Sequence, residues 1–205
     1  IYIMKLRNAE KRLLIAVSQI IENEGFSKIG VNKIAKQAKC DKVLIYRYFG
    51  GLEGLLAAWA KDNDFYTLAY QAYSERVTKA ESSEDIIKLT QTVLLKQLNF
   101  LRTNKLMQEL LAWELSGNST FISIQDERER NGFKLQEELE KKLGKESKDV
   151  RMFITILIAS INYIVLATRQ YRIFNGIDFS NPEAWELCKQ TIYKYIRALF
   201  ENILK

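Results

Sequence analysis

A single proline, Pro182, and nine glycines stand among the 205 residues of this chain. Proline removes a backbone donor and glycine favours turns, so their scarcity leaves long stretches that nothing interrupts. Those stretches are rich in Leu, Ile, Ala, Lys and Glu, which favour helices, and they lack the regular turn signals of a β protein. The sequence therefore predicts an all-α fold.

The chain contains no histidine and only two cysteines, Cys40 and Cys188, which are far apart. Hydrolases with a histidine base and most zinc hydrolases are excluded, because they need histidine as a base or a ligand. Two distant cysteines indicate neither a disulfide framework nor a metal site. We therefore expect a protein that is not an enzyme, with no metal and no cofactor, in the reducing cytoplasm.

Charge is distributed unevenly along the chain. Residues 1–56 carry ten Lys and Arg against five Asp and Glu, whereas residues 57–205 carry 21 against 20. A basic segment attracts the phosphate backbone of nucleic acids, although a solvated basic surface would show the same excess. The charge asymmetry points to nucleic acid as a partner without deciding the matter.

Apolar residues at helical spacing predict three helices in the basic segment. The first runs from about Arg7 to Glu24 and ends at Gly25, where a left-handed cap is expected. A helix of two turns follows at 31–38, and a third begins after Asp41, a good N-cap residue, and runs over 42–49. Two short helices joined by a tight turn are typical of a helix-turn-helix.

Three groups of residues in this segment form a recognisable motif. They are Ile34-Ala35 with Ala38, Tyr46 with Tyr48-Phe49, and Leu55-Leu56. From Arg12 to Leu56 the sequence resembles the DNA-binding signature of the TetR repressor family. The resemblance implies a dimeric, sequence-specific transcriptional regulator that binds an operator in double-stranded DNA, and specifically a repressor released by a small molecule. It also implies an N-terminal helix-turn-helix domain, residues 1–56, followed by a C-terminal helical domain for effector binding and dimerisation, residues 57–205.

The same resemblance assigns roles to side chains around the third helix. It places Lys42, Val43, Tyr46 and Arg47 at the major groove, and Tyr48 and Lys33 near the DNA backbone. Lys42 or Arg47 can donate to guanine, while Val43 and Leu44 can contact a thymine methyl group. Tyr46 and Tyr48 have an alternative role as core aromatics, and we expect Phe49 to belong to the core.

Two positions depart from the family pattern. Gly30 stands near the usual Ser or Thr cap of the second helix, and Leu52 stands where a lysine is common. Each change removes one expected phosphate contact. An alternative therefore remains: a helical small-molecule-binding or scaffolding protein without specific DNA readout.

About five more helices are expected after Asp62. The longest apolar run, Met152–Ala167, is interrupted by polar residues and is shorter than a bilayer span, so we expect no membrane partner but a buried helix over about 147–174. Asn181 and Pro182 predict the start of a last helix over 182–204. The resemblance implies that these two helices pair with their copies in a homodimer.

A further set of large side chains lies on the middle helices and the long apolar helix. If the C-terminal domain encloses a pocket, as the family resemblance implies, a small apolar or amphipathic effector would suit it. The alternative for each side chain is an ordinary core position. The candidate effector-binding residues are Phe100, Leu106, Leu110, Trp113, Phe121 and Tyr163.

Overall fold

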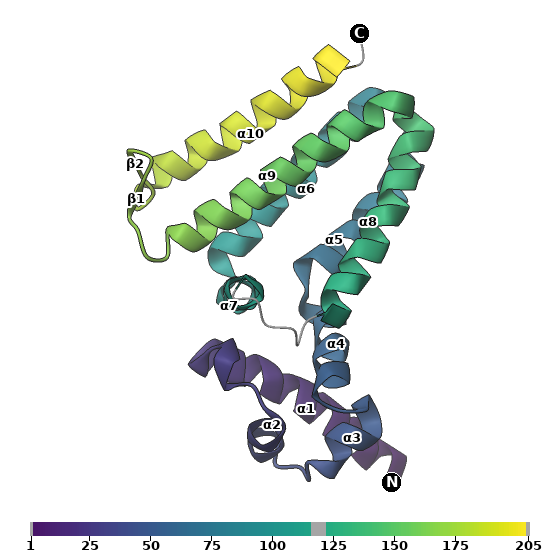
Figure 1. The fold of residues 1–205 in the computed structure, drawn as a ribbon, viewed down its shortest axis with the longest axis vertical. Coiled ribbons are helices and arrows are strands. Elements are labelled where there is room, and N and C mark those ends of the chain that lie inside the picture. Colours follow the sequence, from purple (N-terminus) through teal and green to yellow (C-terminus); the bar gives the residue numbers. More distant parts are fainter. Residues whose placement is uncertain (1, 116–121, 204–205) are drawn as a thin grey trace. The chain divides into compact units, whose positions relative to one another are not determined.

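The structure, a computed structural model, describes residues 2–115 and 122–203, and nearly all of them are helical. The helices and strands are shown in Figure 1. The α-helices are α1 (Tyr2–Glu24), α2 (Val31–Ala38), α3 (Val43–Phe49), α4 (Leu52–Asn63), α5 (Phe65–Thr78), α6 (Ser83–Thr103), α7 (Lys105–Glu114), α8 (Ile122–Leu143), α9 (Ser147–Ala167) and α10 (Pro182–Ile203). The described residues also contain two short 3-10 helices, η1 (Phe26–Lys28) and η3 (Gly144–Glu146). A hairpin follows α9 and consists of β1 (Ile173–Phe174) and β2 (Ile177–Asp178). The expected all-α fold is confirmed.

The chain divides into two compact units. The first comprises residues 1–68 and 105–128, and the second comprises residues 69–104 and 129–205. The first unit thus contains α7 and the start of α8 in addition to α1–α4. This division describes packing, and the functional boundary expected after residue 56 stays a prediction.

In the first unit α1 lies across α2 and contacts α3, α4 and α7. Its apolar face, which includes the fully buried Leu13 and Val17, packs on Ile34 of α2 and Ile45 of α3 in one core. Gly25 ends α1 with a φ of 82°, as the cap signal predicted. This core holds the two short helices at a fixed crossing.

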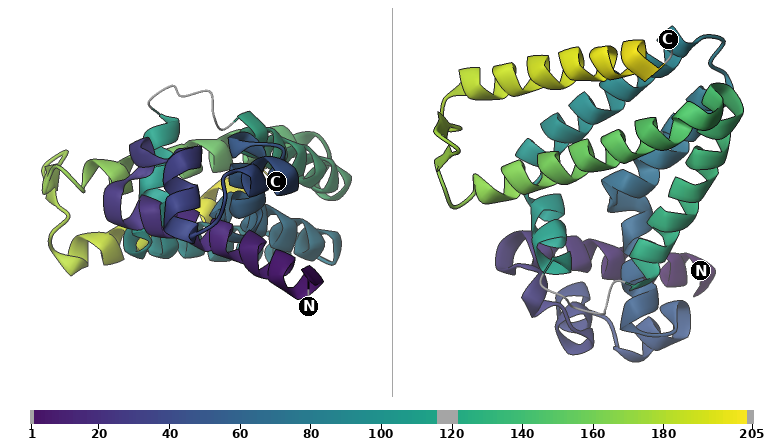
Figure 2. Two further views of the ribbon diagram at one scale, coloured as in Figure 1. Left: turned by 90° about the horizontal axis from the view of Figure 1, so that it is seen from below. Right: turned by 45° about the horizontal axis from the view of Figure 1, so that its top comes forward.

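In the second unit α6 lies beside both α9 and α10 (Figures 1 and 2). Gln97 of α6 donates to Asn162 of α9 at 2.9 Å, and Gln91 of α6 donates to the backbone carbonyl of Tyr193 in α10 at 2.8 Å. Gln91 and Gln97 are buried with the apolar core, Asn162 is half-buried, and these hydrogen bonds set the register of the three helices.

Two element boundaries differ from the sequence-based expectation. The helix expected to reach about residue 174 ends at Ala167, and a hairpin follows it. Asn175 and Gly176 both have positive φ, 49° and 78°, which is the conformation of a two-residue hairpin turn. The number of helices also differs: α4 ends at Asn63 and α5 begins at Phe65, and six α-helices follow Asp64 in the described residues instead of about five.

The apolar helix α9 is less covered than expected. Met152, Ile156 and Tyr163 are all more than half exposed in the single chain, so the expected burial of this face would have to come from a partner chain. The stretch Arg128–Ala167 contains a window long and apolar enough to cross a membrane by length and composition, a test that helices of soluble proteins also pass. An apolar face of this kind requires a partner surface.

Candidate nucleic-acid interface

Helix α3 is fixed at both ends and on one face. Asp41 caps it, since the Val43 amide donates to Asp41 Oδ1 at 2.9 Å, as the sequence predicted. At the other end Gly50 has a φ of 75° and its amide donates to the Tyr46 carbonyl at 2.9 Å. Ile45 is fully buried beneath the helix. A helix of two turns is too short to be stable alone, so these contacts define its position.

The opposite face of α3 is open to solvent. Val43 is 60% exposed and Tyr46 is 56% exposed, and Lys42 and Arg47 are also exposed, whereas Leu44 is half-buried. Positions i, i+1, i+4 and i+5 share one side of a helix, so these four side chains form a single surface. That surface combines two cationic donors, a hydroxyl and a methyl-bearing side chain, which are the groups that recognise base edges in a major groove.

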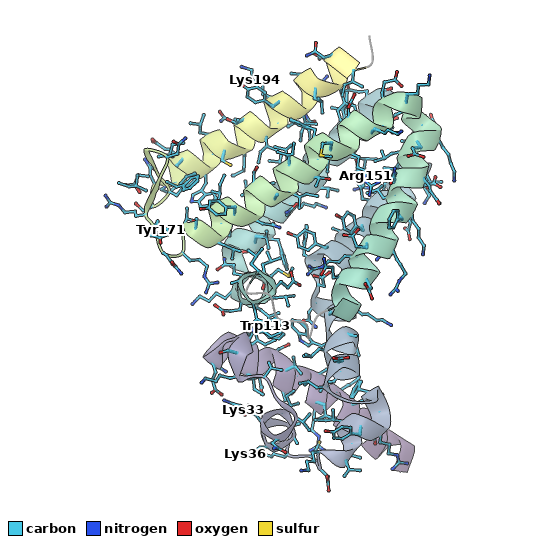
Figure 3. The ribbon with its side chains drawn as sticks, viewed as in Figure 1. Lys33, Lys36, Trp113, Arg151, Tyr171 and Lys194 are labelled. Carbon is cyan, nitrogen blue, oxygen red and sulfur yellow. The ribbon has the colours of Figure 1, made fainter. Side chains whose placement is uncertain are left out.

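Lysines surround this surface on α2 and in the turn. Lys33 forms an ion pair with Glu24, so a phosphate contact by Lys33 would have to compete with that carboxylate. Lys36, also on α2 (Figure 3), and Lys39, in the turn, are exposed according to their accessible surface. These two lysines were not among the predicted DNA contacts, although their spacing of three residues from one another and from Lys42 was a usable signal.

Tyr48 does not face the solvent as the phosphate role would require. Its hydroxyl is buried and has no hydrogen-bond partner among the described residues, while its ring contacts Phe49 edge to face at 6.3 Å. A phosphate contact would need the side chain to turn outward. Its position fits the alternative role as a core aromatic better, and the DNA contact stays a prediction.

Gly54, on α4, positions α3 by its lack of a side chain. A Cβ atom at this residue would lie 1.7 Å from the carbonyl oxygen of Phe49, the last residue of α3. The start of α4 therefore approaches the end of α3 more closely than any other residue would allow. Sequence reasoning missed this glycine, because a lone glycine in a helical pattern carries no directional signal.

The candidate effector residues are divided between the two units. Leu106 and Leu110 are buried in the first unit, where Trp113 packs on Phe26 at 4.8 Å between ring centroids (Figure 3). In the second unit Phe100 is half-buried and Tyr163 is exposed, with its ring 5.5 Å from that of Phe174. Phe121 lies outside the described residues. Core packing thus accounts for Leu106 and Leu110, and an effector role for the set stays a prediction.

The helix pair α2–α3, held by α1 and bearing a basic, solvent-exposed second helix, defines a helix-turn-helix DNA-binding protein. Residues 14–59 match the family model described as "Bacterial regulatory proteins, tetR family". The match covers 46 of the 205 residues, so it identifies the N-terminal segment as a DNA-binding domain of the TetR type, and the chain is a DNA-binding transcriptional regulator. Regulators of this family are not enzymes, in agreement with the sequence-based expectation.

Solved structures share the fold over almost the whole chain. A transcriptional regulator of Streptomyces coelicolor A3(2), SCO7518, is 16% identical, with a TM-score of 0.57 over 94% of this chain and 98% of that one. NalD of Pseudomonas aeruginosa, the secondary repressor of the MexAB-OprM multidrug efflux pump, is 14% identical, with a TM-score of 0.60 over 92% and 95%. FadR of Bacillus subtilis, solved with stearoyl-CoA, is 15% identical, with a TM-score of 0.55 over 94% and 96%. No curated protein gives a significant match to the sequence.

Proposed function

We propose that this protein is a homodimeric cytoplasmic repressor that binds a palindromic operator and is released from it by a small apolar or amphipathic effector. The observation that carries the proposal is the exposed face of α3, on which Lys42, Val43, Tyr46 and Arg47 stand together above a fixed core. One such helix reads one half-site. Specific operator binding by a regulator of this type requires two half-sites.

The apolar surface of the second unit supports a dimer. Met152, Ile156 and Tyr163 recur on one face of α9, and Leu187 and Tyr195 are exposed on the neighbouring α10. A two-fold axis would bring this face against its copy and cover both, as in an isologous interface. We infer that α9 and α10 form the dimer interface and that the two α3 helices reach successive major grooves, ~34–36 Å apart.

The effector class that we propose is supported by the composition and by one protein of the same fold. FadR of Bacillus subtilis was solved with stearoyl-CoA, a ligand with a long apolar chain and a polar head. The residues proposed to contact an effector here are Phe100, Leu106, Leu110, Trp113, Phe121 and Tyr163, within the C-terminal domain, residues 57–205. Effector and operator would favour different states of the dimer, so each would weaken the binding of the other.

The experiment is a selection of bound duplexes from a random pool, made with the full chain and repeated with Arg47→Ala. A palindrome that relaxes at one base pair in each half-site of the Arg47 variant would support specific readout, because a bidentate contact to guanine contributes ~1–3 kcal/mol of discrimination. Arg76→Ala is the matched control, since Arg76 is exposed on α5 in the second unit. It removes the same charge and should leave the selected sequence unchanged.

The same experiment separates the alternative function. Salt-dependent binding with no enriched sequence would indicate a helical ligand-binding or scaffolding protein whose helix-turn-helix no longer reads a site. The departures at Gly30 and Leu52 are the features that favour this alternative. Once an operator is selected, titration of the complex with stearoyl-CoA and with a neutral apolar compound tests release, and an unchanged operator affinity with a bound compound would contradict effector control.

A further inference from the structure

Lys39, in the turn between α2 and α3, adopts a backbone conformation that favours glycine. It has a φ of 51° and a ψ of 46°, in the left-handed region. Its amide donates to the Lys36 carbonyl at 3.2 Å, and the Cys40 amide donates to the Ala35 carbonyl at 3.0 Å. These two hydrogen bonds form a Schellman motif, which requires a left-handed residue directly after the helix and most often has glycine there.

Contacts within the chain do not account for a lysine at this position. The left-handed conformation brings the Cβ atom close to the following carbonyl oxygen, so any residue other than glycine is destabilised in it. Asn175, the other described non-glycine residue with positive φ, has a short polar side chain that tolerates this region. The Lys39 side chain is exposed and forms no hydrogen bond or ion pair within residues 2–115 and 122–203. Its side chain therefore does not offset the strain of its backbone.

The helix-turn-helix around Lys39 holds most of the net positive charge of the chain. Residues 31–49 contain five cationic side chains and one carboxylate, that of Asp41, and so carry four of the six net positive charges. Asp41 Oδ1 accepts the Val43 amide at 2.9 Å, so this carboxylate is partly occupied in capping α3. Little negative charge within this segment opposes an approaching anion.

Three lysines lie along the turn at intervals of three residues. Lys36 stands in the last turn of α2, Lys39 follows the helix, and Lys42 directly precedes α3. All three are exposed, and none has an ion-pair partner among the described residues, whereas Lys33 is paired with Glu24. Unpaired cations beside the exposed face of α3 attract the phosphates that flank a major groove.

From these observations we infer that Lys39 is a phosphate-binding residue of the DNA interface, present at the expense of stability, and that it acts together with Lys36 and Lys42. Its ammonium group contributes affinity for any duplex and no base readout, because a phosphate carries no sequence information. This role deepens the proposed function by naming a backbone contact of the same site. It rests on DNA binding by that surface and not on the choice of an operator.

The test separates the charge of Lys39 from its backbone conformation. Lys39→Gln removes the charge and keeps a side chain in the left-handed region, whereas Lys39→Gly removes both the charge and the strain. The affinity of the full chain is measured by fluorescence anisotropy over a salt series, on the selected operator and on an unrelated duplex of equal length. Lys61→Gln is the matched control for charge, since Lys61 is exposed in the last turn of α4.

Both Lys39 variants should show a weaker salt dependence on both duplexes. The slope of log K against log salt concentration should become shallower by about 0.9, the value for one phosphate contact. Raising the salt from about 50 mM to about 200 mM should then reduce their affinity ~3.5-fold less than it reduces that of the unmodified protein. Lys61→Gln should keep the original slope. Lys39→Gly should also raise the Tm by about 1–4 °C, and Lys39→Gln should leave it nearly unchanged.

The alternative results are distinguishable. An unchanged salt slope in Lys39→Gln would overturn the phosphate contact, and so would a loss of affinity confined to the selected operator, because that loss would indicate base readout. A Tm that does not rise in Lys39→Gly would contradict the expense in stability. If the unmodified protein selects no operator while the slope on the unrelated duplex still falls in both variants, specific repression is wrong and the phosphate contact stands.

Discussion

The apolar face of α9 gives a quantitative prediction for Ile156→Ala. Ile156 is 53% exposed in the single chain, so about half of its side chain is available for burial in a dimer. Full burial of an isoleucine contributes ~1.5–3 kcal/mol, and half of that is about 1 kcal/mol for each copy. A two-fold interface contains the residue twice, so the dimer should lose about 2 kcal/mol. The dimer dissociation constant should then rise ~30-fold.

Sedimentation velocity over a dilution series measures this constant directly. Ile15→Ala is the matched control, because Ile15 is 55% exposed on α1 in the first unit and undergoes the same truncation. It should leave the monomer–dimer equilibrium unchanged. A dimer that Ile156→Ala does not weaken, or that Ile15→Ala weakens equally, would refute the assignment of the interface to α9.

Three other predictions concern the remainder of the fold. Asp41→Ala removes the cap of α3 and should lower the unfolding free energy by ~1 kcal/mol in urea titrations, with a weaker operator complex; an unchanged urea midpoint would contradict the capping role. Gly54→Ala should destabilise by ~1–3 kcal/mol through the clash with α3, whereas Gly132→Ala, with no atom within 4 Å, should stabilise by ~0.5–1 kcal/mol. Burial raises the pKa of Tyr73 to about 12, so the unfolded chain loses this proton near pH 10 and the folded one near pH 12. The free energy of unfolding should therefore fall between pH 10 and pH 12 by about 2–3 kcal/mol more in the unmodified protein than in Tyr73→Phe. The same pH dependence in both proteins would contradict this prediction.

Features that depend on local sequence were predicted from it. Helix periodicity and caps placed α2 and α3, and Asp41 and Asn181 cap their helices as expected, with the Glu183 amide donating to Asn181 Oδ1 at 2.9 Å. The end of α9 was missed, although Asn175-Gly176 is a strong hairpin signal. Strands of two residues have no periodicity of their own, and the apolar pattern of the helix ran on through them.

The candidate DNA-binding site likewise contains features that the sequence predicts and features that depend on tertiary packing. The exposed face of α3 follows from helical spacing, so Lys42, Val43, Tyr46 and Arg47 were predicted together, and the structure leaves all four accessible. Burial of the Tyr48 hydroxyl depends on how three helices cross, and residue spacing in the sequence does not predict that crossing. Lys33 was predicted as a phosphate contact from the family resemblance, which does not reveal its ion pair with Glu24 on another helix.

The sequence could not predict the ion cluster of Asp64, Glu114 and Arg128, because Asp64, between α4 and α5, is 64 residues from Arg128 in α8. Its energetics nevertheless indicate what it does. Desolvation offsets much of the attraction in a buried ion pair, so apolar residues of similar volume often give equal or greater stability. Stability alone is therefore a poor account of these three charged groups, all of which lie in the first unit. Geometry is the better account, since the bidentate pair fixes both the distance and the direction of α8 relative to the α4–α5 break within the first unit.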